Sequence, residues 1–322
     1  MPDLKEMNVL VTPTSFGKMD RCLIDELESK VGKVTYNESG KPINSPTLAK
    51  MLIGIDGYIA GLDVIDKASL ENATRLRVIA RYGVGVDNID LAYARERGII
   101  VTNTPGANSV SVAEMSIAMM LSLARHIPAS IQATRSGGWP RMNGLTLEGK
   151  TVGLLGFGSI GKAVSVRLLA FGCRVLAYDP FPDVAFVEKV GVKLVGLDEV
   201  LSQSDFVSLH LPLLPETRGM VDAKLLTKMK VGAYLINTAR GELIIETDLV
   251  AAIQTQHLAG AALDVFPVEP PPSENLLLNL PQVLVTPHLS SHTDGATNRM
   301  GWMALEDCLA ALSGEKPRCQ IV

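Results

Sequence analysis

"TVGLLGFGSIGKAVSVRLLAFG", residues 151–172, decides the fold of the longer part of the chain. An apolar segment leads into Gly156, Gly158 and Gly161, and an amphipathic segment leads out of them. The first glycine permits a tight turn, the second lets an anion approach the backbone, and the third lets a helix pack closely on a strand. The helix N-terminus supplies free N–H groups and a partial positive charge. The stretch predicts a strand, turn and helix that bind the pyrophosphate of a dinucleotide; the alternative is a glycine cluster that only forms a turn.

The next apolar segment, "CRVLAYDP" at residues 173–180, ends in an acidic residue. Asp179 follows Gly156 by 23 residues (179 − 156). A carboxylate there accepts hydrogen bonds from ribose hydroxyls and repels a 2′-phosphate, so the cofactor is predicted to be NAD rather than NADP. Otherwise Asp179 only caps its strand. The predicted cofactor contacts at this turn are Gly156, Gly158, Ser159, Ile160, Gly161 and Asp179.

Short apolar segments alternate with amphipathic ones along the rest of the chain, which predicts parallel strands joined by helices in an α/β fold. The first set of predicted strands is 8–14, 33–37, 57–61, 76–83 and 98–103. The second set is 151–158, 173–180, 192–195, 206–212, 233–240, 258–266 and 283–288. Helices are predicted at 109–127 and 294–313, and the proline-rich residues 266–281 are predicted to form a loop. Six or seven near-parallel strands with intervening helices make one complete doubly wound domain.

Size and charge narrow the class of protein. The 322 residues suffice for two domains, and the net charge of −4 with dispersed basic residues argues against a partner such as nucleic acid or an anionic membrane. The apolar stretch within 109–127 contains Glu114 and is too short to span a bilayer, and "MPDLKEMNVLV" does not resemble a signal peptide. Four cysteines without metal-ligand spacing predict reduced thiols in the cytoplasm and no metal site.

Titratable residues follow three of the late predicted strands, where open α/β sheets bind ligands. Arg240 is suited to hold a carboxylate through two parallel hydrogen bonds. His288 can exchange a proton near neutral pH, and Glu269 would fix its tautomer and favour its charged form. Each residue also has a plain interpretation: a surface ion pair for Arg240, a solvated loop residue for Glu269 and a strand cap for His288. Their shared position downstream of a dinucleotide fold favours the catalytic interpretation.

At this point the chain resembles the D-isomer-specific 2-hydroxyacid dehydrogenase family over nearly its whole length. The segments that carry the resemblance are "RYGVGVDNID" (81–90), "VTNTPGANSVSVAE" (101–114), "GLLGFGSIGKAV" (153–164), "INTARGELI" (236–244), "AALDVFPVEPPP" (261–272) and "VTPHLSSHT" (285–293). The resemblance implies a Rossmann NAD-binding domain, 103–291, inserted in a smaller flavodoxin-like substrate domain, 1–102 plus 292–322. It also implies a homodimer, because 109–127 is similar to the family's dimer-forming segment.

The resemblance assigns roles to individual residues. Arg240, Glu269 and His288 match the family's catalytic trio, with Arg240 and the N–H groups of Val84 and Gly85 holding the 2-oxo acid and His288 giving a proton to the carbonyl oxygen. Asp264 is expected to hold the nicotinamide carboxamide. The further expected cofactor contacts are His210, Pro212, Thr217, Thr238 and Ser290. No proton chemistry is expected of His210.

Within the family the chain most resembles phosphoglycerate dehydrogenases, and a short form without a regulatory domain is expected. Arg81 is the candidate for the distal anion of the substrate, and the alternative is a salt bridge to Asp87 or Asp90. Formate dehydrogenases carry Gln where Glu269 stands, so formate is rejected. Many relatives have Gly or Ala where Ser290 stands, which leaves hydroxypyruvate, glyoxylate or another substituted pyruvate as alternatives. A non-enzymatic alternative is an NAD-sensing scaffold similar to C-terminal-binding-protein corepressors.

Overall fold

The computed structural model describes residues 3–322 and divides into two compact units. The smaller unit contains the described residues up to Asn108 together with His292–Val322, and the larger unit is Ser109–Ser291. The sequence predicts that the chain first passes from the smaller to the larger unit between residues 102 and 103, whereas in the structure it does so after Asn108. Residues 103–108 remain with the smaller unit because the Thr104 N–H donates to the Gly83 carbonyl and Ala107 is buried in that unit's core.

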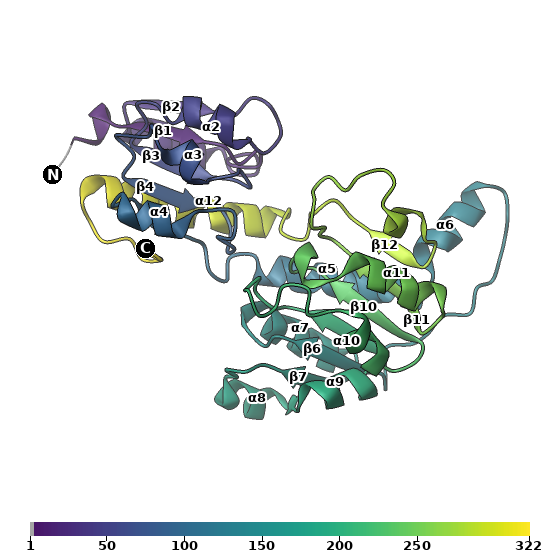
Figure 1. The fold of residues 1–322 in the computed structure, drawn as a ribbon. Helices are drawn as coiled ribbons and strands as arrows, with labels where there is room; N and C mark the ends of the chain where they lie inside the picture. The colour runs from purple at the N-terminus through teal and green to yellow at the C-terminus, as the bar shows by residue number, and fades with distance from the viewer. Residues whose placement is uncertain (1–2) are drawn as a thin grey trace. The chain divides into compact units, whose positions relative to one another are not determined.

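The larger unit is built on a seven-stranded parallel sheet in the order β12-β11-β10-β9-β6-β7-β8 (Figure 1). Its strands are β6 (Thr151–Leu155), β7 (Arg174–Tyr178), β8 (Lys193–Leu194), β9 (Phe206–Leu209), β10 (Ala233–Asn237), β11 (Leu258–Leu263) and β12 (Val283–Val285). The chain enters at β6 in the middle, builds outward to β8, and then returns to place β9 on the other side of β6. This reversal is the topological switch point at which doubly wound sheets bind dinucleotides.

Helices cover both faces of this sheet, so the strands are apolar on both sides. One face packs against α5 (Ser109–Ala124), α7 (Ser159–Ala170) and α8 (Val184–Val190). The other packs against α9 (Leu197–Gln203), α10 (Ala223–Lys228) and α11 (Glu246–Gln254). Neighbouring residues of one strand enter opposite cores: Leu154 lies in the first core and Leu155 in the second. The remaining elements are α6 (Ile127–Arg135), η2 (Gly241–Leu243) and η3 (Leu276–Asn279).

The smaller unit has a five-stranded parallel sheet in the order β2-β1-β3-β4-β5, which is the flavodoxin order. Its strands are β1 (Asn8–Val11), β2 (Lys33–Tyr36), β3 (Gly57–Ala60), β4 (Val78–Arg81) and β5 (Ile100–Thr102). Its helices are η1 (Leu4–Glu6), α1 (Cys22–Lys30), α2 (Ser45–Met51), α3 (Lys67–Leu70), α4 (Leu91–Glu96) and α12 (Asp294–Ser313). The C-terminal helix α12, yellow in Figure 1, packs on β3 and β4 and completes a core that begins with β1.

All twelve predicted strands are present, and the predicted α/β fold with two parallel sheets is confirmed. The strands are shorter than predicted because their last residues turn away into the loops that carry the candidate site. The predicted helix 109–127 was too long: α5 ends at Ala124, and His126 adopts a left-handed conformation (φ 51°) before α6 begins. The proline-rich loop contains one short 3₁₀ helix, η3.

Within residues 3–322 no single helix is long and apolar enough to cross a membrane. The helices α5 and α6, which meet at a bend of 60°, together have the length and composition of a membrane span, and only length and composition point to one.

Burial of α12 yields the first prediction. Leu305 is 1% exposed in the core of the smaller unit, so Leu305→Ala should lower the free energy of unfolding by about 2–5 kcal/mol through lost burial and the cavity left behind. The neighbouring Glu306→Ala is the control, because Glu306 is exposed and forms a surface ion pair with Arg318. Trp302 fluorescence during urea unfolding measures both, and equal stability of the two variants would contradict the assigned packing of α12.

Candidate active site

The glycine turn between β6 and α7 has the geometry that the sequence predicts. Gly156 has φ 96°, and a Cβ built on it would lie 2.4 Å from the carbonyl oxygen of His210. A Cβ on Gly161 would lie 2.4 Å from the carbonyl oxygen of Gly156. Both positions exclude side chains because backbone atoms, which cannot move aside, occupy the space. The turn is therefore pressed between β9 and the first turn of α7.

Gly158 differs from its two neighbours because the space beside it is open. A Cβ on Gly158 would meet nothing within 4 Å, and Gly158 is the N-cap of the twelve-residue helix α7 without a side-chain hydrogen bond to the helix. Ser159 is exposed and Ile160 half-buried at the start of the helix. An uncapped helix N-terminus beside open space fits the pyrophosphate of a dinucleotide.

Asp179 follows the end of β7 and braces the glycine turn. Its carboxylate accepts a hydrogen bond from the Phe157 N–H at 2.7 Å and another from the Phe181 N–H at 2.8 Å. Each carboxylate oxygen has a second lone pair, so these bonds leave room for ribose hydroxyls. The carboxylate thus fits the NAD ribose while it fixes the turn that precedes α7.

Two further predicted cofactor residues follow β9. Burial lowers the pKa of His210 to about 4, and its buried Nε2 has no hydrogen-bond partner among residues 3–322. The ring is therefore neutral near pH 7 and unsuited to give a proton there. Thr217 closes the turn that follows, because its hydroxyl donates to the Pro212 carbonyl at 2.7 Å and accepts from the Leu214 N–H.

The end of β10 carries Thr238 and Arg240. Thr238 is buried and shares a 3.0 Å hydrogen bond with Ser116 of α5. The Asn237 side chain holds the next turn, because its amide donates to the Arg240 carbonyl at 2.8 Å and its oxygen accepts from the Ala239 N–H. A Cβ on Gly241 would lie 2.0 Å from the backbone of Phe266, so the turn beyond Arg240 lies against the segment that leads to Glu269.

Asp264 fastens the end of β11 to the segment that contains His288. The carboxylate is 1% exposed and accepts hydrogen bonds from the Thr286 hydroxyl at 2.5 Å and the Leu289 N–H at 2.9 Å. It also accepts from the N–H and the hydroxyl of Ser290. The Asp264 carbonyl accepts from the His288 N–H at 2.8 Å. Asp264 therefore sets the path of the backbone on both sides of His288.

His288 and Glu269 form a hydrogen-bonded pair. His288 Nδ1 lies 2.8 Å from Glu269 Oε2, while Glu269 Oε1 accepts from the Phe266 N–H at 3.1 Å. Partial burial acts to raise the pKa of Glu269, but the hydrogen bond and charge of His288, the Phe266 N–H and the charge of Arg240 together hold that pKa below its ordinary value. A carboxylate at Nδ1 keeps the proton on that nitrogen and leaves Nε2 for proton exchange.

The predicted substrate residues of the smaller unit occupy the loop after β4. Arg81 is buried at 5% exposure, and its guanidinium donates to the backbone carbonyls of Ala60, Tyr82 and Gly85. Val84 and Gly85 are half-buried. The contact predicted between Arg81 and a substrate anion stays a prediction, and the guanidinium has a structural task in this loop.

The larger unit brings together most of the predicted site residues at one edge of its sheet. Because all seven strands are parallel, the carboxyl ends of β6, β7, β9, β10, β11 and β12 meet there. Two residues that the sequence did not single out support this edge: the Thr286 hydroxyl donates to Asp264, and the Asn237 amide donates to the Arg240 carbonyl. In the smaller unit the unpredicted residue is Asn103, whose amide donates to the Val84 carbonyl at 2.7 Å. Their signal is a small polar residue at the end of an apolar strand.

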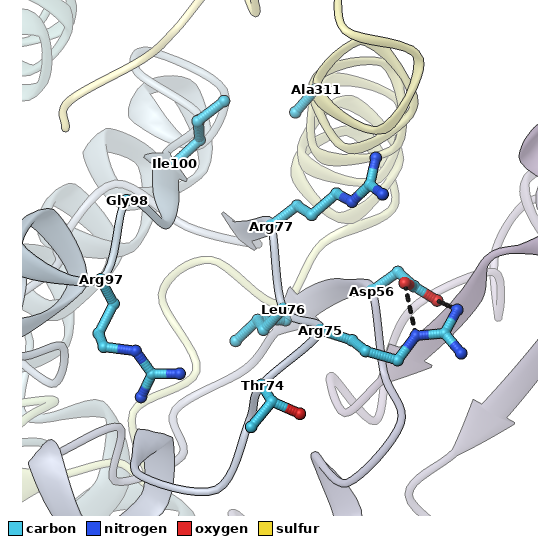
Figure 2. Close-up of a pocket in the computed structure, with 9 residues that line it drawn as sticks. All are labelled: Asp56, Thr74, Arg75, Leu76, Arg77, Arg97, Gly98, Ile100 and Ala311. Carbon is cyan, nitrogen blue, oxygen red and sulfur yellow. Dashed lines mark hydrogen bonds and ion pairs between the residues drawn. The ribbon is translucent and has the colours of Figure 1, made fainter. Parts of the chain in front are cut away.

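A hollow of about 700 Å³ in the smaller unit contains none of the predicted site residues (Figure 2). Arg75 lines it and makes a two-pronged ion pair with Asp56, with Nε and Nη2 at 3.0 and 2.9 Å from the carboxylate oxygens. Arg97 also lines it, and its guanidinium donates to the carbonyls of residues 70, 71 and 73. These two arginines stabilise the segment before β4, so the hollow is separate from the predicted chemistry.

Comparison with known proteins places this geometry in a family. The model of the D-isomer specific 2-hydroxyacid dehydrogenase NAD binding domain matches residues 117–290. D-3-phosphoglycerate dehydrogenase of Mycobacterium bovis is 42% identical over 279 residues, which are 85% of this chain and 53% of that protein. Hydroxypyruvate reductase of Thermotoga maritima is 43% identical over 236 residues, 72% of this chain and 76% of that protein. The crystal structure of the TT0316 protein of Thermus thermophilus is 38% identical with a TM-score of 0.86, covering 98% of this chain and 100% of that one.

The chain belongs to the D-isomer-specific 2-hydroxyacid dehydrogenase family. It spans about half the length of the phosphoglycerate dehydrogenases that it matches. The matched region is the family's NAD-binding domain, so NAD is the cofactor of the larger unit. In the described part of the chain, no three His, Cys, Asp or Glu side chains gather in a way that could hold a metal ion.

The open space at Gly158 yields the second prediction. Gly158→Ala should raise the Kd for NADH by about tenfold or more, because the methyl group occupies the room for the pyrophosphate while the fold accommodates it. Gly196→Ala is the matched control, since Gly196 is also the N-cap of a helix, α9, and also has open space beside it. NADH fluorescence titration measures binding. Wild-type affinity in Gly158→Ala would remove the phosphate role from this turn.

Proposed function

We propose that the protein is an NAD-dependent D-2-hydroxyacid dehydrogenase that works as a 2-oxo acid reductase. The observation that carries the proposal is the 2.8 Å contact between His288 Nδ1 and Glu269 Oε2 at the edge of the sheet where the glycine turn also lies. A histidine oriented by a carboxylate is a general acid and base, and an oxidation at C2 of a hydroxy acid needs one.

Each residue of the candidate site has its own role in the proposed reaction. When bound, the nicotinamide supplies or accepts the hydride. Arg240 binds the carboxylate of the 2-oxo acid through its guanidinium. Protonated His288 donates from Nε2 to the carbonyl oxygen, and Glu269 stabilises the imidazolium before the transfer. In the reverse direction neutral His288 takes the hydroxyl proton. Asp264 keeps His288 in place.

The substrate that we propose is a small 2-oxo acid with an anionic distal group, such as phosphohydroxypyruvate. Names of relatives support both this acid and hydroxypyruvate as candidates. Ser290 bears on the choice because its hydroxyl donates to Asp264 and the residue is 4% exposed. A serine engaged in this way supports the His288 segment and does not by itself select an acid.

We also propose that the protein is a cytoplasmic homodimer that binds neither nucleic acid nor membranes. Exposed apolar side chains around α6 support a protein interface: Ile127, Ile131, Trp139, Met142 and Leu145. Large exposed apolar side chains gathered in one segment of the chain suit an interaction site. The four cysteines are free thiols, which suits a reducing compartment. Sedimentation of the purified protein tests the dimer.

A substrate panel gives the third prediction. Purified protein with NADH should reduce at least one of phosphohydroxypyruvate, hydroxypyruvate and glyoxylate. His288→Asn should lower kcat by roughly 10²–10⁴-fold, the usual contribution of a general acid, with the Kd for NADH unchanged.

The matched control is His257→Asn, because His257 lies in the same unit and its Nε2 is hydrogen-bonded to the Leu226 carbonyl at 3.0 Å. Near-normal turnover by His288→Asn would refute the proton-donor role. Tight NADH binding without turnover of any acid would instead favour an NAD-sensing scaffold.

The pH dependence gives the fourth prediction. The pKa of Glu269 lies below the ordinary glutamate value. The ionised carboxylate therefore supports His288 at every pH above the ordinary glutamate pKa, and this support is lost only as the pH falls through the lowered pKa. The reduction rate should therefore hold as the pH falls through the ordinary glutamate pKa and should drop only at lower pH, where Glu269 takes up a proton.

In Glu269→Gln this fall of kcat/KM at acid pH should disappear, because no carboxylate remains to take up a proton, and kcat/KM should be lower at neutral pH because the imidazolium lacks its neighbouring negative charge. Glu274→Gln is the control, since Glu274 lies in the same loop and its carboxylate accepts from the adjacent Ser273. An unchanged profile in Glu269→Gln would show that the pair does not govern the proton transfer.

A further inference from the structure

In the loop after β4 the backbone carbonyls accept hydrogen bonds, whereas two backbone N–H groups donate none to the described residues. The carbonyls of four successive residues, 82 to 85, each accept a hydrogen bond. Among residues 3–322, neither the Val84 N–H nor the Gly85 N–H donates one. Buried or half-buried N–H groups without partners are uncommon, and successive ones form a site for an anion.

Two neighbouring residues at the end of β5 fix the two central peptide groups. The Thr104 N–H donates to the Gly83 carbonyl at 3.0 Å, and the Asn103 amide donates to the Val84 carbonyl at 2.7 Å. In a planar trans peptide the C=O of one residue and the N–H of the next point in opposite directions. Holding the two carbonyls toward β5 therefore directs the N–H groups of Val84 and Gly85 away from it.

Arg81 fastens both ends of the same loop. Its Nη1 donates to the Tyr82 carbonyl, and its Nε donates to the Gly85 carbonyl at 3.1 Å. The guanidinium also lies against Gly83, where a Cβ would come within 2.7 Å of Nη1 and where φ is 150°. The planar fork of arginine can hold several carbonyls at once, which the single ammonium of lysine cannot do in the same geometry.

We propose that Arg81 and Asn103 are positioning residues, which hold the loop Tyr82–Gly85 as a backbone site for the substrate carboxylate, and that Arg81 does not contact the substrate. This inference rests on the proposed function, since the carboxylate belongs to a 2-oxo acid. It has a consequence for specificity: every 2-oxo acid carries the carboxylate, so the loop serves acids with and without a distal phosphate equally.

The test compares the KM values of three acids in matched variants. Asn103→Ala and Arg81→Met should each raise KM by on the order of tenfold for glyoxylate, hydroxypyruvate and phosphohydroxypyruvate alike, with the Kd for NADH within about twofold of wild type. Arg81→Lys should resemble Arg81→Met, because it keeps the charge and loses the fork.

The controls remove the same chemical groups from other loops of the smaller unit. Arg97→Met removes a guanidinium that holds backbone carbonyls, and Asn8→Ala removes an amide that donates to the Gly54 carbonyl at 2.9 Å. Both should leave KM within about twofold of wild type. Loss confined to phosphohydroxypyruvate in Arg81→Met, with activity retained by Arg81→Lys, would overturn the proposal and make Arg81 a direct contact.

A measurement independent of activity separates this proposal from the proposed function. Amide hydrogen exchange at Thr104, whose N–H is bonded to the loop, should speed up in Asn103→Ala and in Arg81→Met. If wild-type protein reduces no 2-oxo acid, the proposed function fails while this exchange still reports on the loop. Unchanged exchange at Thr104 in Asn103→Ala, or an unchanged KM for glyoxylate in that variant, would overturn the positioning role even if Arg81→Met fails to fold.

Discussion

The buried carboxylate of Asp264 is the interaction on which the candidate site depends. It satisfies the backbone N–H groups of Leu289 and Ser290 and the hydroxyls of Thr286 and Ser290, so the segment that follows β12 has a single path. That path holds His288 at φ 49°, a conformation that costs a side-chain-bearing residue about 1–3 kcal/mol. The hydrogen bonds around Asp264 offset this cost and bring the imidazole to Glu269.

Environment gives the two histidines at the strand ends of the larger unit opposite properties. His210 has a buried Nε2 without a described partner, and burial lowers its pKa to about 4. His288 contacts an ionised carboxylate, whose own pKa is held down by the positive charges beside it. Two identical side chains at one edge of one sheet are therefore assigned different tasks, and only the paired one suits proton transfer.

Local chemistry explains why the sequence predicted the glycine turn so well. Gly156 and Gly161 are required by backbone atoms within 2.4 Å of a would-be Cβ, so their spacing is a direct record of the turn. The contacts of Arg81 were less predictable. They come from Ala60, Tyr82 and Gly85, on two neighbouring segments, and the sequence showed only a cation near a glycine-rich loop. Likewise the helix predicted to reach residue 127 ends at Ala124, because His126 adopts a left-handed conformation. Composition gives no sign of that conformation, so the sequence did not predict the earlier end.

The sequence alone determined the two parallel sheets and the nucleotide turn, and it predicted Arg240, Glu269 and His288 as site residues, because each follows from a residue pattern within one strand and the loop after it. Tertiary structure decided which groups meet. The contact of Glu269 with His288 spans 19 residues, and those of Asp264 with the His288 segment span up to 26. Hydrogen bonds between neighbouring strand ends depend on strand order and register, and these are set only when the strands assemble into the sheet.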